Sequence, residues 1–500
     1  MRTLTVRVAV LATVVLTVLL GVLVPPRAMA QITFERTYGG VDDDCGYSVA
    51  QTADGGYVIA GESVPFGADS SDLYLIKTDG VGDAVWTRTY GGASRDWGYS
   101  LDETSDGGYI IAGATWSFGA GTYDVYLIKT NSAGDTVWTR TCGDVDMEAA
   151  NSVLRTTGGG YIIAGWTHSY GGGSSDVYLI KTDSGGDTVW TRAYGGTDTD
   201  GGSSVDQTTD GGYIIAGETM SFGAGEGDVY LIKTDSGGDT MWTRTYGGVD
   251  SDYGLSVCET GDGGYIIAGV TASFGAGAGD VYLIKTDGDG DTVWTRTYGG
   301  SGEDGAYSLG ETSDGGYVIA GWTDSFGSGS YDVYLIKMDN GGDTVWTRSY
   351  GGPNLDWGYS VEQTSDGGYI IAGLTSSYGA GGDDVYLIKT DADGFVQVTE
   401  GREETRRPAS WHLRQNHPNP FGAATTISYA LRDAQSVTIA IYDIRGALVR
   451  ELVGGTVSAG QHQVVWDGRD GRGQSVASGI YFCSMEAGEL RETRRMVLLR

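Results

Sequence analysis

The sequence predicts an all-β protein in which a seven-bladed β-propeller precedes a small antiparallel β-sandwich. Three observations support this. The motif DGGYIIAG recurs seven times with small changes, and its tyrosines are spaced by 52 residues throughout: Tyr57, Tyr109, Tyr161, Tyr213, Tyr265, Tyr317 and Tyr369. Each unit contains four β-rich runs separated by Gly/Asp/Ser turns, which is typical of a propeller blade. Further short β-rich runs after residue 411 predict the sandwich.

Residues 1–30 have the pattern of a secretory signal peptide. Arg2 and Arg7 precede an apolar run from Val8 to Val24, and Ala28 and Ala30 form a small-residue cleavage site. We expect cleavage after Ala30 and export of the mature chain from the cytoplasm. An uncleaved membrane anchor is the alternative interpretation, and no later apolar run could span a bilayer.

The predicted propeller occupies residues 31–398. In one unit the four strands are expected at residues 99–104, 108–115, 124–130 and 136–141. The first two are joined by Ser-Asp-Gly-Gly, and Asp-Gly supplies the positive φ that a tight hairpin needs. A fourth strand precedes the first unit at Phe34–Thr37, and the last unit lacks a proper one. We therefore expect the N-terminal strand to complete the seventh blade, with Phe395–Val398 as a weak competitor.

Charge is strongly asymmetric along the chain. The formal net charge is −33, and residues 31–400 alone carry about −39, which disfavours a nucleic-acid partner. The same charged positions recur in every unit, so we interpret them as structural pairs between strands. They are the third-strand lysines (Lys77, Lys129, Lys181, Lys233, Lys285, Lys337, Lys389), the fourth-strand arginines (Arg36, Arg88, Arg140, Arg192, Arg244, Arg296, Arg348) and the third-strand aspartates (Asp72, Asp124, Asp176, Asp228, Asp280, Asp332, Asp384).

The last hairpin of each unit suggests a sheet register. Folding it about Val81 places Ile76 opposite Trp86 and Tyr74 opposite Arg88. In that arrangement the arginine guanidinium lies against a packed aromatic ring.

Aspartates are concentrated in the turns between the third and fourth strands. Asp287, Asp289 and Asp291 form an Asp-x-Asp-x-Asp pattern that could supply carboxylate ligands to calcium. Tyr298 occupies the twelfth position, where an EF-hand has glutamate, so an EF-hand is excluded. Hairpin chemistry is the preferred interpretation of these turns. Calcium is the one ion the sequence suggests, and no other cofactor is expected.

Variation between units indicates where a ligand could bind. The connections from second to third strand, and from each unit to the next, vary most, and binding usually occurs on such loops. The aromatic that recurs in the loops from second to third strand is interpreted as packing between neighbouring blades (Phe66, Phe118, Tyr170, Phe222, Phe274, Phe326, Tyr378). Tryptophans that break the repeat are the candidate ligand-binding residues, suited to stacking on sugar rings: Trp97, Trp116, Trp166, Trp322 and Trp357.

The third unit departs most from the repeat. Cys142 replaces the usual tyrosine, Gly158 replaces the turn aspartate, and His168 is the single histidine of residues 31–400. No catalytic residues are assigned, because the chain shows no metal-ligand spacing, nucleophile motif or phosphate loop. The four cysteines lie at unrelated positions and do not form a disulfide framework.

The C-terminal segment begins after a charged linker at residues 399–411. Strands are predicted at Thr426–Leu431, Ser436–Tyr442, Gln463–Trp466 and Gly479–Ser484. They place a small β-sandwich in residues 412–500.

This segment resembles the type A C-terminal sorting domain of type IX secretion substrates, which is related to the immunoglobulin-like domain of flagellar hook-capping proteins. The matching residues are Asn416, Pro418, Asn419, Pro420 and Phe421, then Ile441-Tyr442-Asp443, Gly446, Trp466-Asp467-Gly468, Gly473, Ala477 to Tyr481 and Arg495 to Leu499. The resemblance implies an immunoglobulin-like sandwich that engages the secretion machinery. It also implies passage across the outer membrane to the cell surface or the medium. The repeats similarly resemble bacterial seven-bladed propeller repeats and, distantly, kelch units.

Together these observations favour a secreted or cell-surface, non-catalytic binding or adhesion propeller whose partner is an extracellular glycan or protein. The alternatives are an enzyme, a hydrolase or lyase that acts on extracellular polysaccharide through rim carboxylates, and a structural envelope protein. The near-perfect symmetry of the units argues against an enzyme, because an active site normally needs blades that differ.

Overall fold

The structure is a computed structural model that describes residues 31–64, 70–396, 412–413, 416, 419, 421–422, 424–431, 435–457, 460–487 and 490–499. The predicted signal peptide, with Ala28 and Ala30, and the predicted linker lie outside these residues, as do Phe66, Pro418 and Pro420. The chain divides into two compact units, Met1–Gln397 and Val398–Arg500. No helix among the described residues is long and apolar enough to cross a membrane.

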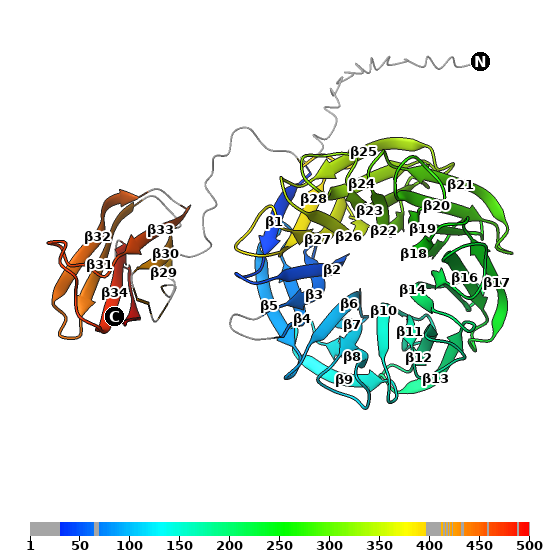
Figure 1. Ribbon diagram of the computed structural model, residues 1–500, viewed down its shortest axis with the longest axis horizontal. Coiled ribbons are helices and arrows are strands. Elements are labelled where there is room, and N and C mark those ends of the chain that lie inside the picture. The colour runs from blue at the N-terminus through cyan, green and yellow to red at the C-terminus, as the bar shows by residue number, and fades with distance from the viewer. Residues whose placement is uncertain are drawn as a thin grey trace, which may run out of the picture. The chain divides into compact units, whose positions relative to one another are not determined.

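The first unit is a ring of seven four-stranded antiparallel sheets, as predicted (Figure 1). The innermost strands are β2 (Asp44–Gln51), β6 (Asp96–Glu103), β10 (Glu148–Arg155), β14 (Asp200–Gln207), β18 (Asp252–Glu259), β22 (Asp304–Glu311) and β26 (Asp356–Gln363). The second strands are β3 (Tyr57–Ser63), β7 (Tyr109–Thr115), β11 (Tyr161–Thr167), β15 (Tyr213–Thr219), β19 (Tyr265–Thr271), β23 (Tyr317–Thr323) and β27 (Tyr369–Thr375).

The outer half of each blade completes the ring. The third strands are β4 (Asp72–Thr78), β8 (Asp124–Thr130), β12 (Asp176–Thr182), β16 (Asp228–Thr234), β20 (Asp280–Thr286), β24 (Asp332–Met338) and β28 (Asp384–Thr390). The outermost strands are β5 (Ala84–Tyr90), β9 (Thr136–Cys142), β13 (Thr188–Tyr194), β17 (Thr240–Tyr246), β21 (Thr292–Tyr298), β25 (Thr344–Tyr350) and, for the seventh blade, β1 (Phe34–Tyr38).

The N-terminal strand closes the ring. β1 pairs with β28 from Phe34 opposite Lys389 to Tyr38 opposite Val385, as expected. Phe395, part of the predicted competitor, lies instead in a turn beneath the guanidinium of Arg348, whose Cζ is 4.1 Å from the ring centroid. Figure 1 shows β1 beside β28, next to the first blade.

The hydrophobic core lies between neighbouring blades. One cluster joins Val58, Ala60 and Leu75 of the first blade to Ile111 and Ile128 of the second, and every blade boundary has an equivalent. The fully buried aliphatic run of the second and third strands supplies this core on both faces of each sheet. Each blade is therefore stabilised by burying apolar surface against its two neighbours.

A β-bulge shapes every innermost strand. In the second blade the register shifts between Gly98 and Ser100, so Tyr99 has no cross-strand partner. A Cβ at Gly113 would lie 1.9 Å from the carbonyl oxygen of Trp97, so only glycine permits this close approach of β6 and β7. The AG pair of the DGGYIIAG motif therefore belongs to the bulge.

The register predicted for the outer hairpin is wrong by one residue. Lys77, not Ile76, lies opposite Trp86, and Leu75, not Tyr74, lies opposite Arg88. The cause is a second bulge at Lys77/Thr78, which offsets the two strands beside the turn. The predicted stacking is nevertheless present, because the Cζ of Arg88 lies 5.4 Å from the centroid of the Trp86 ring.

The recurring cations form structural pairs with turn aspartates. The buried Lys129 lies 3.0 Å from Asp106 in the hairpin turn of its own blade, and six blades share this pair. Arg140 lies 3.0 Å from Asp187 of the next blade, and five blades share that pair. The third-strand aspartates do not join these pairs, because they lie at the opposite end of the strand. Asp124 accepts a hydrogen bond from the amide of Gly121 instead.

The second unit consists of two antiparallel sheets. One contains β29 (His412–Leu413), β30 (Thr425–Leu431) and β33 (Gly460–Trp466). The other contains β31 (Gln435–Asp443), β32 (Leu448–Val457), β34 (Gly479–Ala487) and β35 (Leu490–Leu498). The four predicted strands are present, and β29, β32 and β35 were not predicted. The sheets enclose a core around the fully buried Trp466, consistent with an immunoglobulin-like sandwich.

Candidate ligand-binding site

The bulge residues of the innermost strands break the seven-fold symmetry of the propeller. They are Tyr47, Tyr99, Asn151, Ser203, Leu255, Tyr307 and Tyr359. The four tyrosines occupy consecutive blades, because the seventh blade adjoins the first (Figure 1). Each is half-buried. A bulge residue is released from cross-strand pairing, so this position can vary while the blade is preserved.

The four tyrosines form one continuous arc. Ring centroids lie 4.7 Å apart between Tyr307 and Tyr359, 5.1 Å between Tyr359 and Tyr47, and 5.3 Å between Tyr47 and Tyr99. These distances are typical of interacting aromatic pairs. The innermost strands of four consecutive blades thus carry contacting aromatic rings at the bulge, whereas those of the other three carry the smaller Asn151, Ser203 and Leu255.

Three predicted tryptophans extend the arc at the second and third blades. Trp97 stacks on Tyr99 and contacts Trp116 edge-on at 6.1 Å. Tyr123, in the loop before β8, stacks on Trp116 at 5.1 Å and meets Trp166 at 6.1 Å. The structure therefore brings Trp97, Trp116 and Trp166 together, and Tyr123 is the residue that joins them. Trp116 is the most open of the three, with 42% of its surface exposed.

The other two predicted tryptophans extend the arc at the sixth and seventh blades. Trp322 lies 4.4 Å from Tyr307 and 6.0 Å from Trp357, and Trp357 lies 5.9 Å from Tyr359. A Cβ at Gly305 would lie 2.2 Å from the Trp322 ring, so glycine on β22 makes room for that ring. We call the whole set the aromatic band: Trp97, Tyr99, Trp116, Tyr123, Trp166, Tyr47, Tyr359, Trp357, Tyr307, Trp322 and Tyr331.

Polar groups accompany the band at the first blade. The phenol of Tyr47 donates a 2.5 Å hydrogen bond to Glu62 on β3. Burial, with the neighbouring Cys45 and Glu62, raises the pKa of Tyr47 far above its ordinary value, so the phenol remains a donor. A cavity of about 460 Å³ opens here between blades, lined by Asp43, Glu62, Val64, Ser70, Ser71, Arg95, Trp97 and Tyr99.

A second polar contact lies at the sixth-blade end of the band, where the ring centroid of Tyr331 lies 6.1 Å from that of Trp357. Tyr331 donates a 2.7 Å hydrogen bond to Glu303, and this bond, followed by burial, raises the pKa of Tyr331 to about 12. The middle of the band and its sixth-blade end therefore each combine an aromatic face with a carboxylate. This combination suits a ligand with a ring face and hydroxyl groups, since hydroxyls donate to carboxylates and accept from phenols.

The sequence analysis singled out the five tryptophans that the structure brings into the band, but not the four bulge tyrosines or the loop residue Tyr123. The signal was available, because aligning the seven units shows one position of the first strand changing among Tyr, Asn, Ser and Leu. His168, singled out in the third unit, is exposed and lies 5.1 Å from Trp166 at the edge of the band. The recurring loop aromatics pack within the blade, as Phe118 does on Tyr126 at 5.6 Å.

The aspartate-rich turn shows hairpin chemistry. The Asp287 carboxylate accepts hydrogen bonds from the amides of Asp289 and Asp291, at 3.0 and 2.9 Å. Among the described residues, no group of three or more His, Cys, Asp or Glu side chains is arranged to hold a metal ion. Calcium binding at these three residues stays a prediction. All four cysteines are unpaired.

The described residues of the predicted sorting motif hold the C-terminal sandwich together. Phe421 is 2% exposed and packs on Trp466 at 5.5 Å. The side chain of Asn416 is buried and donates to the hydroxyl of Thr425 at 2.9 Å. Asn419 bonds the backbone of β35 twice, through the amide of Val497 and the carbonyl of Arg495. Asn419 is therefore hydrogen-bonded to the last strand, whereas Asn416 contacts β30 and Phe421 contacts β33.

The chain was compared with known families and proteins. Residues 421–489 match the FlgD Ig-like domain family. A 172-residue stretch is 28% identical to the regulatory protein FlaEY of Caulobacter vibrioides. That match covers 29% of this chain and 18% of the relative, so the chain spans less than a fifth of that protein's length.

The comparison with solved structures gave matches of low identity and low TM-score. PorZ of Porphyromonas gingivalis, described as an essential bacterial surface component of the type-IX secretion system, is 13% identical with a TM-score of 0.42. That alignment covers 93% of this chain and 60% of PorZ. The Pan2 WD40 domain of Neurospora crassa is 9% identical with a TM-score of 0.41, over 72% of this chain and 100% of that domain.

Proposed function

We propose that this protein is a secreted or cell-surface binding protein whose propeller captures extracellular saccharides on the aromatic band. The observation that carries the proposal is the continuity of the band over five of seven near-identical blades. Aromatic residues occupy bulge and loop positions where the blade fold accepts many residue types. Packing within the blades does not require these aromatic residues to lie on consecutive blades, as they do here.

The chemistry of the band supports a saccharide ligand. Aromatic rings offer flat apolar faces to the C–H faces of sugars, and exposed Trp and Tyr are typical of binding surfaces. The cavity beside Trp97 and Tyr99 has the size of a small-ligand site, and it presents Glu62 and Arg95 as hydrogen-bonding groups. A protein ligand would use the same anchors and is the alternative partner.

The C-terminal domain is proposed to deliver the propeller to its place of action through contact with the secretion machinery. Support comes from the motif residues quoted above and from the match of residues 421–489 to the FlgD Ig-like domain family. On this proposal the chain crosses both membranes and is then released or attached at the surface. A family fold does not by itself define a partner, so export requires its own test.

The test of binding is a polysaccharide panel incubated with the chain lacking residues 1–30. Retention of protein on each polymer and release of soluble sugar are measured in the same samples. Retention without release is the expected result. Soluble product would favour the polysaccharide-acting enzyme, and neither retention nor release would favour a protein partner or a structural envelope role.

A further inference from the structure

The third blade carries an altered turn on the rim opposite the variable loops. In six blades the buried third-strand lysine pairs with the turn aspartate at 2.8–3.0 Å. In the third blade Gly158 takes the place of that aspartate. The ammonium of Lys181 instead donates to the carbonyls of Gly159 and Thr182, at 2.9 and 2.7 Å. Among the described residues no carboxylate lies within ion-pairing distance of Lys181.

The backbone of this turn has changed with the side chain. Gly159 and Gly160 both have positive φ, +84° and +74°, whereas the matching turn of the second blade has positive φ at Gly107 alone. In the second blade the equivalent Thr104 donates to the turn aspartate Asp106. Thr156 donates instead to the Gly159 carbonyl at 2.8 Å. A Cβ at Gly158 would meet nothing within 4 Å. The absence of the aspartate therefore leaves open space at Gly158 and leaves Lys181 without an ion-pair partner among the described residues.

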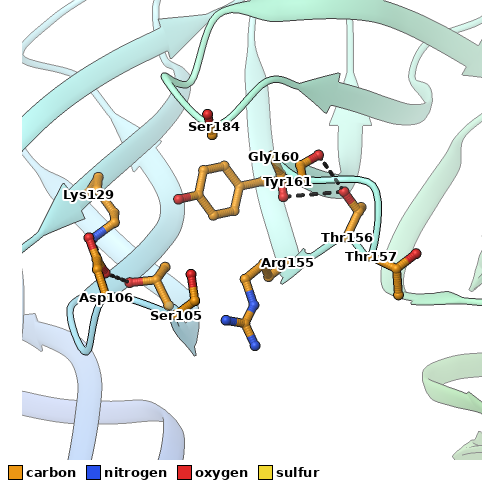
Figure 2. Close-up of a pocket in the computed structure, with 11 residues that line it drawn as sticks. Ser105, Asp106, Lys129, Arg155, Thr156, Thr157, Gly160, Tyr161 and Ser184 are labelled. Carbon is orange, nitrogen blue, oxygen red and sulfur yellow. Dashed lines mark hydrogen bonds and ion pairs between the residues drawn. The ribbon is translucent and has the colours of Figure 1, made fainter.

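A cavity of about 540 Å³ lies beside this turn, between the second and third blades. It is lined by Thr104, Ser105, Asp106, Lys129, Arg155, Thr156, Thr157, Gly159, Gly160, Tyr161 and Ser184. Figure 2 shows the Arg155 side chain extending from the end of β10, with Ser105 on one side and Thr156 on the other in this view. The hydroxyls of Ser105, Thr157 and Ser184 add donors around it.

Arg155 is the single cation at its position in the repeat. The equivalent residues are Gln51, Glu103, Gln207, Glu259, Glu311 and Gln363. The exposed Arg155 guanidinium makes no hydrogen bond or ion pair with the described residues, although its backbone amide donates to Asp102 at 2.9 Å. An unpaired guanidinium retains its full planar set of donors for a ligand.

The lining of this cavity carries an excess of positive charge, with Lys129 and Arg155 against Asp106. A neighbouring cavity of about 460 Å³, between the first and second blades, has Lys77 against Asp54 and Asp79. Lys181 lies next to the first cavity, since its ammonium donates to the carbonyl of the lining residue Gly159. In a propeller region of net charge about −39, the third blade thus holds a local cationic site.

We propose that this cavity binds the oxyanion group of a ligand, a carboxylate or sulfate such as acidic saccharides carry. The Arg155 guanidinium matches two oxygens of such a group, the hydroxyls donate to the remainder, and Lys181 supplies a second positive charge. This site lies on the rim opposite the aromatic band and does not depend on the band's binding a saccharide.

The test uses the chain lacking residues 1–30, titrated calorimetrically with sodium sulfate and with sodium glucuronate at ionic strength held constant with sodium chloride. Two variants come from the chain's own repeats. Arg155→Gln installs the residue of three other blades, and Gly158→Asp restores the aspartate of six, so both suit the fold. We expect saturable binding of at least one anion and at least a tenfold loss of affinity in each variant.

Controls separate this site from the rest of the molecule. Trp116→Ala, in the aromatic band, should leave anion binding unchanged, and melting temperatures verify that each variant is folded. Binding of both anions would support a general oxyanion site, and binding of one would identify its preferred group. If neither anion shows saturable binding, or if Arg155→Gln binds as tightly as the unmodified chain, the proposal is overturned.

Discussion

At the scale of single residues, the propeller separates positions that maintain the fold from positions that are free to vary. Arg88, Trp86 and Lys77 belong to contacts that recur blade after blade. The bulge residue has no cross-strand partner, and in this chain it is Tyr on one side of the ring and Asn, Ser or Leu on the other. A binding surface can therefore change without altering the scaffold.

The first prediction concerns Trp116. Replacing it with alanine should lower affinity for a retained polysaccharide at least about fivefold, because an exposed aromatic anchor typically contributes more than about 1 kcal/mol. Met220 occupies the same place in the fourth blade, is similarly exposed at 46% compared with 42%, and lies outside the aromatic band. Met220→Ala should therefore leave retention unchanged. Equal effects of the two changes would argue against the band as the binding site.

The second prediction concerns pH. Hydrogen bonds from Thr104, followed by those from Lys129, lower the pKa of Asp106 to about 2, from an unfolded value near 4. A depressed folded pKa contributes stability above the unfolded pKa, and that contribution is lost as pH falls from about 4 to about 2. The thermal denaturation midpoint should therefore decrease as the pH is lowered from about 4 to about 2.

The Asp106→Asn variant tests the origin of that loss. Its midpoint should lie below that of the unmodified chain at pH 5 and approach it near pH 2, where Asp106 is protonated in both states. The gap should be small, since the Asp106 side chain is 63% exposed and solvent screens the pair. A gap that stays constant with pH would exclude the ion pair as its cause.

The sequence predicted only part of the aromatic band. Trp97 and Trp357 stand out because they interrupt a repeat, and all five tryptophans do join the band. Tyr47 and Tyr307 are less conspicuous, because tyrosine is common in every unit and alternation does not identify the bulge position. The meeting of Tyr359 with Tyr47 depends on ring closure, which connects residues 312 positions apart in the chain.

At the scale of elements, ring closure depends on one five-residue strand. β1 supplies the outer edge of the seventh blade, and Phe34 packs against Tyr57 of the first blade at 5.9 Å. Phe34 stands where the other outer strands have tryptophan, and Arg36 lies over its ring as in every blade. β1 thus joins the last blade to the first.

The third prediction tests this closure. Phe34→Ala should lower the free energy of unfolding by about 3–5 kcal/mol, since it empties a buried aromatic site at the closing junction. Phe34→Trp should retain stability, because Trp86 fills the same role in the next blade. Chemical denaturation followed by tryptophan fluorescence measures both. A loss as large for Phe34→Trp as for Phe34→Ala would contradict this account.

The fourth prediction concerns how turns pack on the preceding blade. Gly134 has φ of +79°, and a Cβ there would lie 2.8 Å from the Trp86 ring. Gly107 has nearly the same φ, +76°, and open space around its Cβ position. Gly134→Ala should therefore destabilise the protein by about 1–3 kcal/mol more than Gly107→Ala, the excess reflecting the clash. Equal losses in the two variants would mean that backbone strain alone is responsible.

The same turns show why element detail could not be read from the sequence. The four strands per blade follow from alternation and turn residues, but the bulge at Lys77/Thr78 reverses which side chains face each other. Nothing in the hairpin's composition marks that bulge. In the second unit, β32 and β35 were missed because their charged and glycine-rich segments, such as RETRR, lack clean alternation.

At the scale of the whole molecule, period and end structure together define the architecture. The constant spacing of 52 residues predicts seven blades, and the orphan strand at Phe34–Thr37 predicts closure, which the pairing of β1 with β28 confirms. The proposed anion site could not be predicted from the sequence. It depends on side-chain positions, because only these show that Arg155 and Lys181 have no ion-pair partner among the described residues.

The fifth prediction concerns export. Deleting residues 412–500 should leave the propeller folded but retained inside the cell, because the proposed sorting domain forms a compact unit of its own. Phe421→Ala should reduce export by unfolding that domain, since Phe421 is packed on Trp466. Cell fractionation with an antibody to the propeller measures both. Normal export of the deleted chain would remove the sorting role.

The strand that closes the ring also sets an order of events in time. β1 begins at Phe34, and its partner β28 is synthesised some 350 residues later. On the proposed export route, a chain that crosses a membrane from its N-terminus would hold this first strand unpaired until the last blade has emerged. Completion of the propeller would then be coupled to completion of translocation, and a chain truncated before residue 384 would lack the partner strand of β1.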